Sequence, residues 1–407
     1  MPDDKRLSPS SLMTKGYFGL ERENLRINPD GSLALTPHPA AFGDKLTNPE
    51  ITTDFSESQI EIITPVSTSL PELLFREKYL IKKVYRGIGP ELLWPLSSPP
   101  ARLPAEERIP IADFGPAGKD KNDYRAYLAQ KYGRRRQLYC GIHFNFSFAE
   151  ENLYNEGAGV EERNRLYLKM AAVAMRYRFF LVHLLSASPE THGGVCYRSA
   201  RLSASGYKNI EPVYLDYSNP AAYLASLSSA VETGLIESPR ELYQLVRIKG
   251  KGFEDLMWRP EADRIELRIP DLNPLYAEGI NPDDLYLMHL YLMWAAQEED
   301  EPFDRESQAW ADRLSDEAAR MAVSDPLAYQ MRYVFGRLRS FVRQKNLPEI
   351  YANALNQAEG RWLHPARRYA ERICGRIHGE STFAAGTVLA KKIKSVYLHT
   401  AESRRAE

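Results

Sequence analysis

Cysteine is scarce in this chain of 407 residues. The three cysteines, Cys140, Cys196 and Cys374, are widely separated and form no C-x-x-C pair. Their number and spacing argue against a disulfide framework and against a cysteine-based zinc site, and they fit a reducing compartment. We therefore expect a cytoplasmic protein.

An excess of one charge is also missing, because 53 basic residues stand against 54 acidic ones. This balance gives no electrostatic reason to expect nucleic acid or an anionic membrane as a partner. Long apolar runs are absent as well. The N-terminus lacks the apolar stretch of a signal peptide. The most apolar helix candidate, residues 169–188, is interrupted by Arg176 and Arg178, whereas a membrane span needs about 20 apolar residues.

Several sequence motifs of catalysis are missing too. The chain contains neither the G-x-x-x-x-G-K-[ST] phosphate loop nor the G-x-G-x-x-G dinucleotide fingerprint. No G-x-S-x-G nucleophile motif is present. The stretch IKGKGF, residues 248–253, resembles a phosphate loop only superficially and predicts a tight turn. Function must therefore be sought in dispersed side chains that the fold brings together.

Strands and helices do not alternate regularly along the chain, which favours an α+β fold over a doubly wound sheet. The pattern predicts a hairpin and three helices, over residues 26–35, 69–89, 159–188 and 281–297. With 43% hydrophobic residues the chain can bury a large core. We expect a single domain over residues 1–407, with the sheet and the site motifs in 18–295 and a helical portion over 300–400.

Four short segments alternate as strands with one polar face. In GLERENLRI, residues 19–27, alternation places Glu21 and Glu23 on the same face as Leu25 and Ile27. The other three segments are SQIEIIT, GIHFNFSF and DRIELRI, residues 58–64, 141–148 and 263–269. In one antiparallel sheet, the polar face would gather Glu21, Glu23, Glu61, His143, Asn145, Glu266 and Arg268, with Asp54 close by.

An antiparallel sheet with one wet face alternates in this way by default, and its charged residues usually form surface ion pairs. That reading accounts for Arg264 but not for Glu21 and Glu23, which share a face with apolar residues. Like charges on a buried surface repel unless a cation neutralises them. Carboxylates with one imidazole suit Mg²⁺ or Mn²⁺ better than zinc. The residues therefore predict a metal-dependent, ATP-using site on a concave sheet face.

The same motifs resemble the bacterial glutamate–cysteine ligase family, both its stand-alone proteobacterial type and the ligase half of bifunctional glutathione synthetases. The resemblance begins at FGLERENLRINPDG and ITTDFSESQIEIITP. It continues, in family order, through LWPLSSP, YRAYLAQKYG, GIHFNFS, RLSASGY and IELRIPDLNP. It implies a strongly curved antiparallel sheet with a polar concave face, related to the catalytic part of glutamine synthetase and backed by helices.

The resemblance also implies the chemistry. ATP phosphorylates the γ-carboxylate of L-glutamate, and the amino group of L-cysteine attacks the γ-glutamyl phosphate to give γ-glutamylcysteine, the first step of glutathione synthesis. The protein's work is positioning and charge neutralisation. Because no second ATP-binding half follows the ligase motifs, a separate glutathione synthetase is expected downstream.

Roles for individual residues follow from the same match. The metal-binding residues of the family correspond to Glu21, Glu23, Asp54, Glu61, His143 and Glu266. Arg201 matches the arginine that binds the α-carboxylate of glutamate, and Arg268 matches the arginine on the transferred phosphate. Residues around the acceptor amino acid and the intermediate correspond to Tyr124, Arg125 and Tyr207, with Phe55, Leu128 and Gln137 lining the cysteine pocket. Tyr243 and Asn145 are further site candidates.

Two alternatives stay open at this point. One is a γ-glutamyl ligase with another amino acid or amine acceptor, because a small change in such a pocket shifts preference only modestly. The other is an inactive relative that binds metal or nucleotide, although all six metal-ligand candidates are present. The apolar and tyrosine candidates, moreover, are residue types that ordinarily occur in a core or at its edge.

Overall fold

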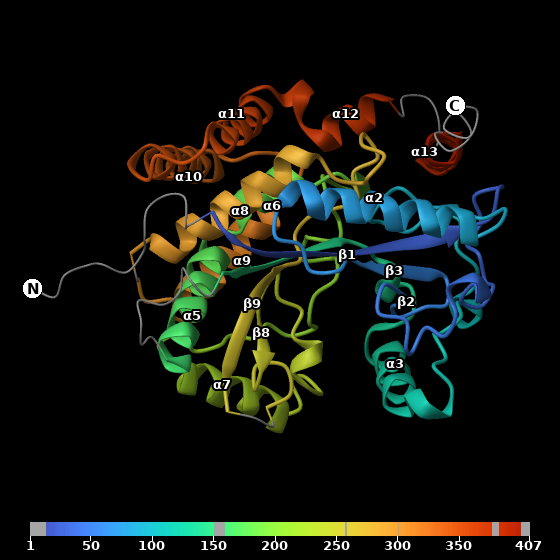
Figure 1. The fold of residues 1–407 in the computed structure, drawn as a ribbon, viewed down its shortest axis with the longest axis horizontal. Coiled ribbons are helices and arrows are strands. Elements are labelled where there is room, and N and C mark those ends of the chain that lie inside the picture. The colour runs from blue at the N-terminus through green and yellow to red at the C-terminus, as the bar shows by residue number, and fades with distance from the viewer. Residues whose placement is uncertain (1–13, 150–158, 257–258, 300, 377–381, 400–407) are drawn as a thin grey trace, which may run out of the picture.

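The computed structural model describes residues 14–149, 159–256, 259–299, 301–376 and 382–399. Its central sheet is antiparallel, in the order β2-β3-β1-β5-β9-β8, and β4 pairs with the end of β1. The strands are β1 (Gly16–Ile27), β2 (Ile51–Thr53), β3 (Gln59–Ile63), β4 (Leu92–Leu93), β5 (Ile142–Phe148), β8 (Val246–Lys251) and β9 (Glu261–Leu267). In Figure 1, β1 runs across the molecule with the shorter β3 beside it, while β9 and β8 descend steeply, so the sheet is strongly curled. A separate hairpin consists of β6 (Glu190–His192) and β7 (Val195–Tyr197).

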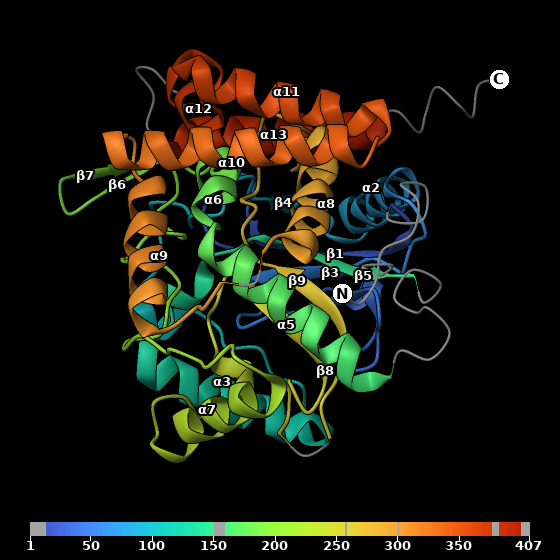
Figure 2. The ribbon, with the colours of Figure 1, turned by 90° about the vertical axis from the view of Figure 1, so that its left-hand side faces the viewer.

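Helices back the sheet and extend beyond it (Figures 1 and 2). Those up to the last strand are α2 (Leu70–Gly87), α3 (Lys119–Tyr132), α5 (Val160–Arg176), α6 (Phe179–Leu185) and α7 (Pro220–Glu232). The later ones are α8 (Pro282–Gln297), α9 (Arg305–Ala318), α10 (Asp325–Gln344), α11 (Glu349–Leu363), α12 (Tyr369–Arg376) and α13 (Thr382–His399). This arrangement confirms the predicted α+β class, the curved antiparallel sheet and the helical C-terminal portion.

The strand register places the predicted polar residues in rows on the concave face. Glu23 lies opposite Glu61 across β1 and β3, Glu21 lies opposite His143 across β1 and β5, and Asn145 lies opposite Glu266 across β5 and β9. Residues directly opposite each other in an antiparallel pair share a face. The period of two in each sequence segment therefore becomes one continuous polar surface.

The opposite face packs into the main core. Phe18, Leu20, Phe144 and Phe146 are at most 3% exposed, and the ring of Phe146 lies 4.6 Å from that of His289 on α8. Helix α8 is buried nearly all round, as its apolar sequence predicts. The core thus packs against the apolar face of the sheet, and the polar face is left for ligands.

Two of the three predicted helices form as expected. Ser69 caps α2 by accepting a hydrogen bond from the Glu72 amide, and Asn281 caps α8 in the same way. The helix predicted over residues 159–188 is wrong in one respect, because it is broken at Tyr177 and Arg178. The Arg178 guanidinium binds the carbonyl of Met175 and the carboxylate of Asp312, which are contacts that residue periodicity cannot reveal.

The hairpin over residues 26–35 is shorter than predicted, with a single bridge between Ile27 and Leu33. The reason is that β3 occupies this edge of β1 up to Leu25, which pairs with Gln59. The tight turn predicted at 248–253 is also wrong at its start, because residues up to Lys251 form strand β8 and pair with β9. Among the described helices, none has the length and apolarity to cross a membrane.

Candidate functional site

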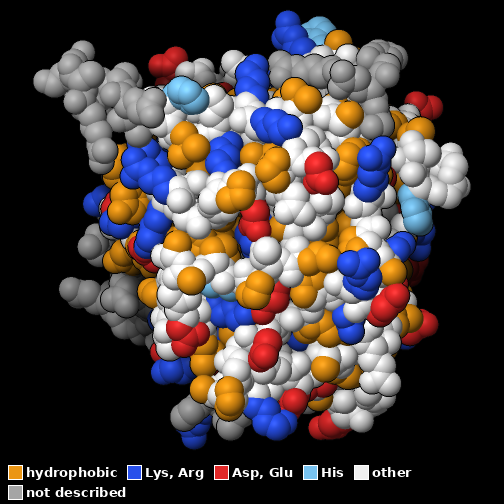
Figure 3. Space-filling view, turned by 90° about the vertical axis from the view of Figure 1, so that its right-hand side faces the viewer, with side chains coloured by type: hydrophobic (Ala, Val, Ile, Leu, Met, Phe, Trp, Pro, Cys, Tyr) orange, Lys and Arg blue, Asp and Glu red, His pale blue; other side chains and the backbone are white. Residues whose placement is uncertain are grey.

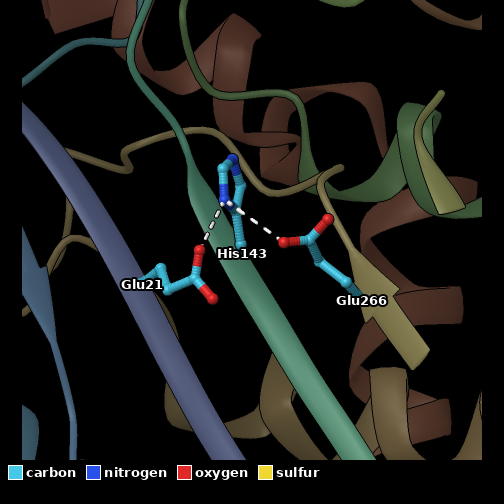
Figure 4. Close-up of side chains that lie close together, drawn as sticks. All are labelled: Glu21, His143 and Glu266. Atoms are coloured by element: carbon cyan, nitrogen blue, oxygen red, sulfur yellow. Dashed lines mark hydrogen bonds and ion pairs between the residues drawn. The ribbon is translucent and has the colours of Figure 1, made fainter. Parts of the chain in front are cut away.

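Three side chains from neighbouring strands converge at the middle of the concave face (Figure 4). Nδ1 of His143 lies 3.3 Å from Oε2 of Glu21 and 4.0 Å from Oε1 of Glu266. The ligand atoms of the three residues all lie within 4.8 Å of one another. On the other side of the imidazole, Nε2 of His143 lies 3.6 Å from Oε1 of Glu23. The histidine therefore stands between carboxylates of β1 and β9.

The charges around Glu266 are strongly coupled. Burial raises the pKa of Glu266, but the positive charges of Arg268 and Lys249 outweigh it, so the net pKa lies well below the ordinary value. Nη1 of Arg268 lies 3.3 Å from Oε2 of Glu266. Burial lowers the pKa of His143, and the Arg268 charge adds to that effect, so the imidazole favours its neutral form. A neutral imidazole is the form that binds a metal.

A second group of acids lies where β1 meets β3. Burial, and then the charges of Asp54 and Glu61, raise the pKa of Glu23 well above its ordinary value. Burial, Asp54 and Glu21 raise the pKa of Glu61 to about 8. Glu23 also accepts a hydrogen bond from the amide of Gly141, at 3.0 Å. These acids repel one another in the absence of a cation.

A buried carboxylate oxygen indicates that these acids and His143 suit a hard divalent cation. Oε1 of Glu266 is buried and accepts no hydrogen bond from the described residues, since Nζ of Lys249 lies 3.7 Å away. A buried carboxylate oxygen in that state is costly unless a cation binds it. The remaining donors, carboxylates and one imidazole, are the set that suits Mg²⁺ or Mn²⁺.

Arg201 is held by the loop that follows β9. Its Nε donates to Asp271 at 3.0 Å, and its Nη atoms donate to the carbonyls of Arg268, Ile269 and Pro270 at 2.7–3.0 Å. A guanidinium has five N–H donors, so these four bonds leave one N–H on Nη1. The side chain lines a cavity of about 20 Å³ that also contains Glu23, Asp54, His143, Tyr207 and Arg268. Its predicted contact with a substrate carboxylate stays a prediction.

The residues predicted for the acceptor amino acid line one neighbouring cavity of about 160 Å³. These are Phe55, Tyr124, Arg125, Leu128, Gln137 and Tyr207, and the wall is completed by Asp54, Arg240, Arg268 and the further site candidate Tyr243. The ring of Tyr207 stacks on that of Tyr243 at 4.2 Å, and Nε of Arg125 donates to the carbonyl of Asp54 at 2.6 Å. Because Arg268 borders both cavities, the proposed acceptor pocket adjoins the acid cluster, which consists of Glu23, Asp54 and Glu61.

Sequence reasoning missed Arg240 on the wall of this cavity, and it missed Lys249 and Asp271, which contact predicted side chains. Lys249 projects from β8 and its Nζ lies 3.7 Å from Oε1 of Glu266. The alternation V-R-I-K over residues 246–249 was the available signal, and the glycines after it obscured the strand. Asp271 was missed because its role depends on Arg201, a residue distant in sequence.

Comparisons with known proteins identify the family of the chain. A family model described as glutamate-cysteine ligase matches residues 5–196. The glutamate–cysteine ligase of Clostridium acetobutylicum is 33% identical over 362 residues, which cover 73% of this chain and 75% of that protein. The chain belongs to the glutamate–cysteine ligase family.

Members of this family include fused proteins. The glutathione biosynthesis bifunctional protein of Listeria welshimeri is 37% identical over 405 residues, covering 89% of this chain and 52% of the relative. The chain therefore spans about half the length of this curated relative. The crystal structure of a bifunctional glutathione synthetase from Pasteurella multocida superposes with a TM-score of 0.86 at 30% identity, covering 95% of this chain and 53% of the other. The ligase-family fold thus extends over nearly the whole chain.

Proposed function

We propose that this protein joins the γ-carboxylate of L-glutamate to the amino group of L-cysteine with the hydrolysis of ATP to ADP and phosphate. In this reaction the γ-carboxylate oxygen attacks the terminal phosphorus of ATP and releases ADP. The cysteine nitrogen then attacks the carbonyl carbon of γ-glutamyl phosphate, loses a proton and expels phosphate. The product is γ-glutamylcysteine, and family membership supports this assignment.

The observation that carries the proposal is the position of Arg268. Its guanidinium contacts the metal-ligand candidate Glu266 at 3.3 Å, and its side chain borders the cavity of Asp54 and Tyr207 as well as the acid cluster. Burial lowers the pKa of Arg268, but the charges of Glu266, Tyr207 and Glu23 raise it by more. The net pKa lies above the ordinary value, so the guanidinium stays charged. A fixed cation at this border can neutralise a phosphoryl group between donor and acceptor.

We assign the metal to Glu21, Glu23, Asp54, Glu61, His143 and Glu266. Mg²⁺, or Mn²⁺ in its place, would supply charge neutralisation of the nucleotide phosphates when bound. Arg201, Tyr124, Arg125, Tyr207 and Tyr243 would orient glutamate and the intermediate, and Phe55, Leu128 and Gln137 would shape the site for the cysteine side chain. Asn145 donates to Glu21 at 2.9 Å and would hold that carboxylate in place.

The nucleotide is assigned to the opposite end of the polar face from the acceptor. A third cavity lies there, with a volume of about 430 Å³, and is lined by Gly19, Glu21, Asn145 and Arg264, among others. Placing ATP in it would bring the terminal phosphate to Glu21 and His143 and leave the acceptor cavity free. With glutamate bound on the Arg268 side, its γ-carboxylate oxygen would then approach the terminal phosphorus opposite the ADP leaving group, as an in-line transfer requires.

The wider context remains part of the proposal. We place the enzyme in the cytoplasm and regard residues 1–407 as one catalytic domain, and we expect a separate glutathione synthetase to use the product.

Acidic and basic side chains are interspersed on the face that contains the sheet's β2 edge (Figure 3). This face offers no large surface of one charge to a polyanion.

The test is Mg²⁺-dependent ADP release with glutamate and a panel of acceptors: cysteine, 2-aminobutyrate, alanine, glycine and simple amines. We expect the highest kcat/KM with cysteine and no activity in Glu23→Gln. The matched control is Glu50→Gln, because Glu50 forms a partly exposed pair with Lys83 and should leave the rate unchanged. Preference for another acceptor would refute the cysteine assignment, and the absence of acceptor-dependent ADP release would refute the ligase activity.

A further inference from the structure

A polar ring continues from the metal-ligand candidates toward the proposed nucleotide cavity. On one side, Nζ of Lys249 lies 3.7 Å from Oε1 of Glu266 and 2.7 Å from Oε1 of Glu254. On the other side, Oδ1 of Asn145 accepts a hydrogen bond from Nε of Arg264 at 3.2 Å. Since Asn145 also binds Glu21, both arms of the ring begin at the candidate metal ligands.

Glu254 closes the ring between the two cations. Its Oε1 pairs with Lys249, and its Oε2 lies 4.0 Å from Nη2 of Arg264. The Glu254 carboxylate also accepts a hydrogen bond from the amide of Gly250 at 3.1 Å. The side chain is 35% exposed, so it lies at the edge of the site and not in its core.

Each of the two cations, Lys249 and Arg264, has an acidic partner besides Glu254. Arg264 is 34% exposed and has a second acid, Asp263, at 2.9 Å, and Lys249 is 13% exposed and close to Glu266. Two positive side chains on a concave face beside the metal-ligand candidates form an arrangement that suits a polyphosphate. In the absence of nucleotide, a carboxylate between them satisfies both.

We propose that Lys249 and Arg264 bind the phosphate chain of the nucleotide, and that Glu254 occupies the phosphate position in the free protein and competes with the nucleotide for it. This inference rests on the proposed function. Lys249, next to Glu266, would contact the phosphates nearest the metal, and Arg264, next to Asn145, those farther out. Glu254 must swing away before the nucleotide binds, and a partly exposed ion pair can be exchanged at small cost.

The experiment compares binding of ADP with Mg²⁺ and of adenosine by isothermal titration calorimetry. Removing the competing charge in Glu254→Gln should tighten ADP binding by roughly threefold and leave adenosine binding unchanged. Lys249→Met should weaken ADP binding by about tenfold or more, because a charge-assisted contact is lost. Arg264→Met should weaken it as well, and both variants should bind adenosine like the wild type.

Controls separate this inference from the function it rests on. Glu261→Gln is the matched variant, because Glu261 pairs with Arg163 and Lys251 at the loop end of the same hairpin, the end away from Glu266, and should not alter ADP binding. If Glu254→Gln binds ADP equally well or more weakly, Glu254 is a structural anchor and the inference is wrong. If the wild-type protein binds no ADP at all, the proposed function itself fails.

Discussion

Nη1 of Arg22 lies 3.6 Å from Oε1 of Glu77, and both side chains are buried behind the strand that carries Glu21 and Glu23. No described donor forms a regular hydrogen bond to either carboxylate oxygen of Glu77. Burial raises the pKa of Glu77 to about 7, even with the Arg22 charge nearby. The pair joins α2 to the middle of β1, so its integrity bears on the backbone under the acid cluster.

Breaking this pair from one side should destabilise the fold. Arg22→Met is expected to lower the free energy of unfolding by about 3 kcal/mol or more, because it leaves a buried carboxylate unpaired. The double variant Arg22→Met, Glu77→Met should recover part of that loss. Denaturant unfolding monitored by circular dichroism measures both changes.

The exposed pair Lys119–Asp123 provides the comparison. Replacing Lys119 by Met should cost less than about 1 kcal/mol. A double variant of the buried pair that is less stable than Arg22→Met would show that Glu77 acts independently of Arg22.

Replacement of Arg268 should affect turnover more than binding of the metal. Arg268→Lys keeps the positive charge near Glu266 but loses the planar fork that can contact two phosphate oxygens at once. We expect kcat for ADP release to fall by about 100-fold or more, as for a lost transition-state donor, with Mn²⁺ affinity changed little. Steady-state kinetics and Mn²⁺ titration by electron paramagnetic resonance give the two quantities.

Arg163→Lys is the matched variant for this test. Arg163 pairs with Glu261 at 3.0 Å, at the opposite end of β9, and its replacement should leave kcat within a few-fold of wild type. An Arg268→Lys enzyme with normal kcat would remove Arg268 from the phosphoryl-transfer step.

A site residue could be predicted from the sequence where the pattern that indicates it lies within one short segment. Period-two alternation is local, so the polar face and the partners Glu21, His143 and Glu266 could be predicted before the strands were seen to pair. The motifs that resemble the ligase family supplied the candidates around Tyr124 and Leu128, which fall on one cavity. Residue patterns within single strands were sufficient for the polar face alone.

Contacts between distant segments could not be predicted in this way. The break at Tyr177 depends on Arg178 meeting Asp312 on another helix, and the binding of Arg201 by Asp271 depends on a loop 70 residues away. Lys249 was hidden because glycines suggest turns, whereas here Gly250 sits at a bulge inside a strand pair, with φ at +132°.

The size of the acceptor cavity should set acceptor preference. Leu128 is 5% exposed and lines this cavity from α3. Leu128→Ala is expected to shift the kcat/KM ratio of norvaline to 2-aminobutyrate by about tenfold toward the longer acceptor, the scale of one methylene in an apolar pocket. Leu166→Ala, on α5 and outside the cavity, should destabilise the protein without changing the ratio. An unchanged ratio in Leu128→Ala would place the acceptor side chain elsewhere.

The raised pKa of Glu61 links stability, pH and metal. Its value in the metal-free fold is about 8 against an ordinary 4.5, because of burial and the charges of Asp54 and Glu21. The folded state therefore holds the proton more tightly than the unfolded state, and its contribution to stability is complete below about pH 4.5 and is lost as the pH rises toward 8.

A divalent cation requires the ionised carboxylate, so its effect has the opposite sign. In the absence of metal we expect the Tm to fall between pH 6 and pH 8, and we expect Mg²⁺ to raise it more at pH 8 than at pH 6. Differential scanning calorimetry with and without EDTA measures the four values. Glu61→Gln should flatten the metal-free profile and reduce the Mg²⁺ effect, whereas Glu50→Gln should retain both. If Mg²⁺ raises the Tm equally at both pH values, proton release from this acid cluster does not accompany metal binding, and Glu61 is not among the metal's ligands.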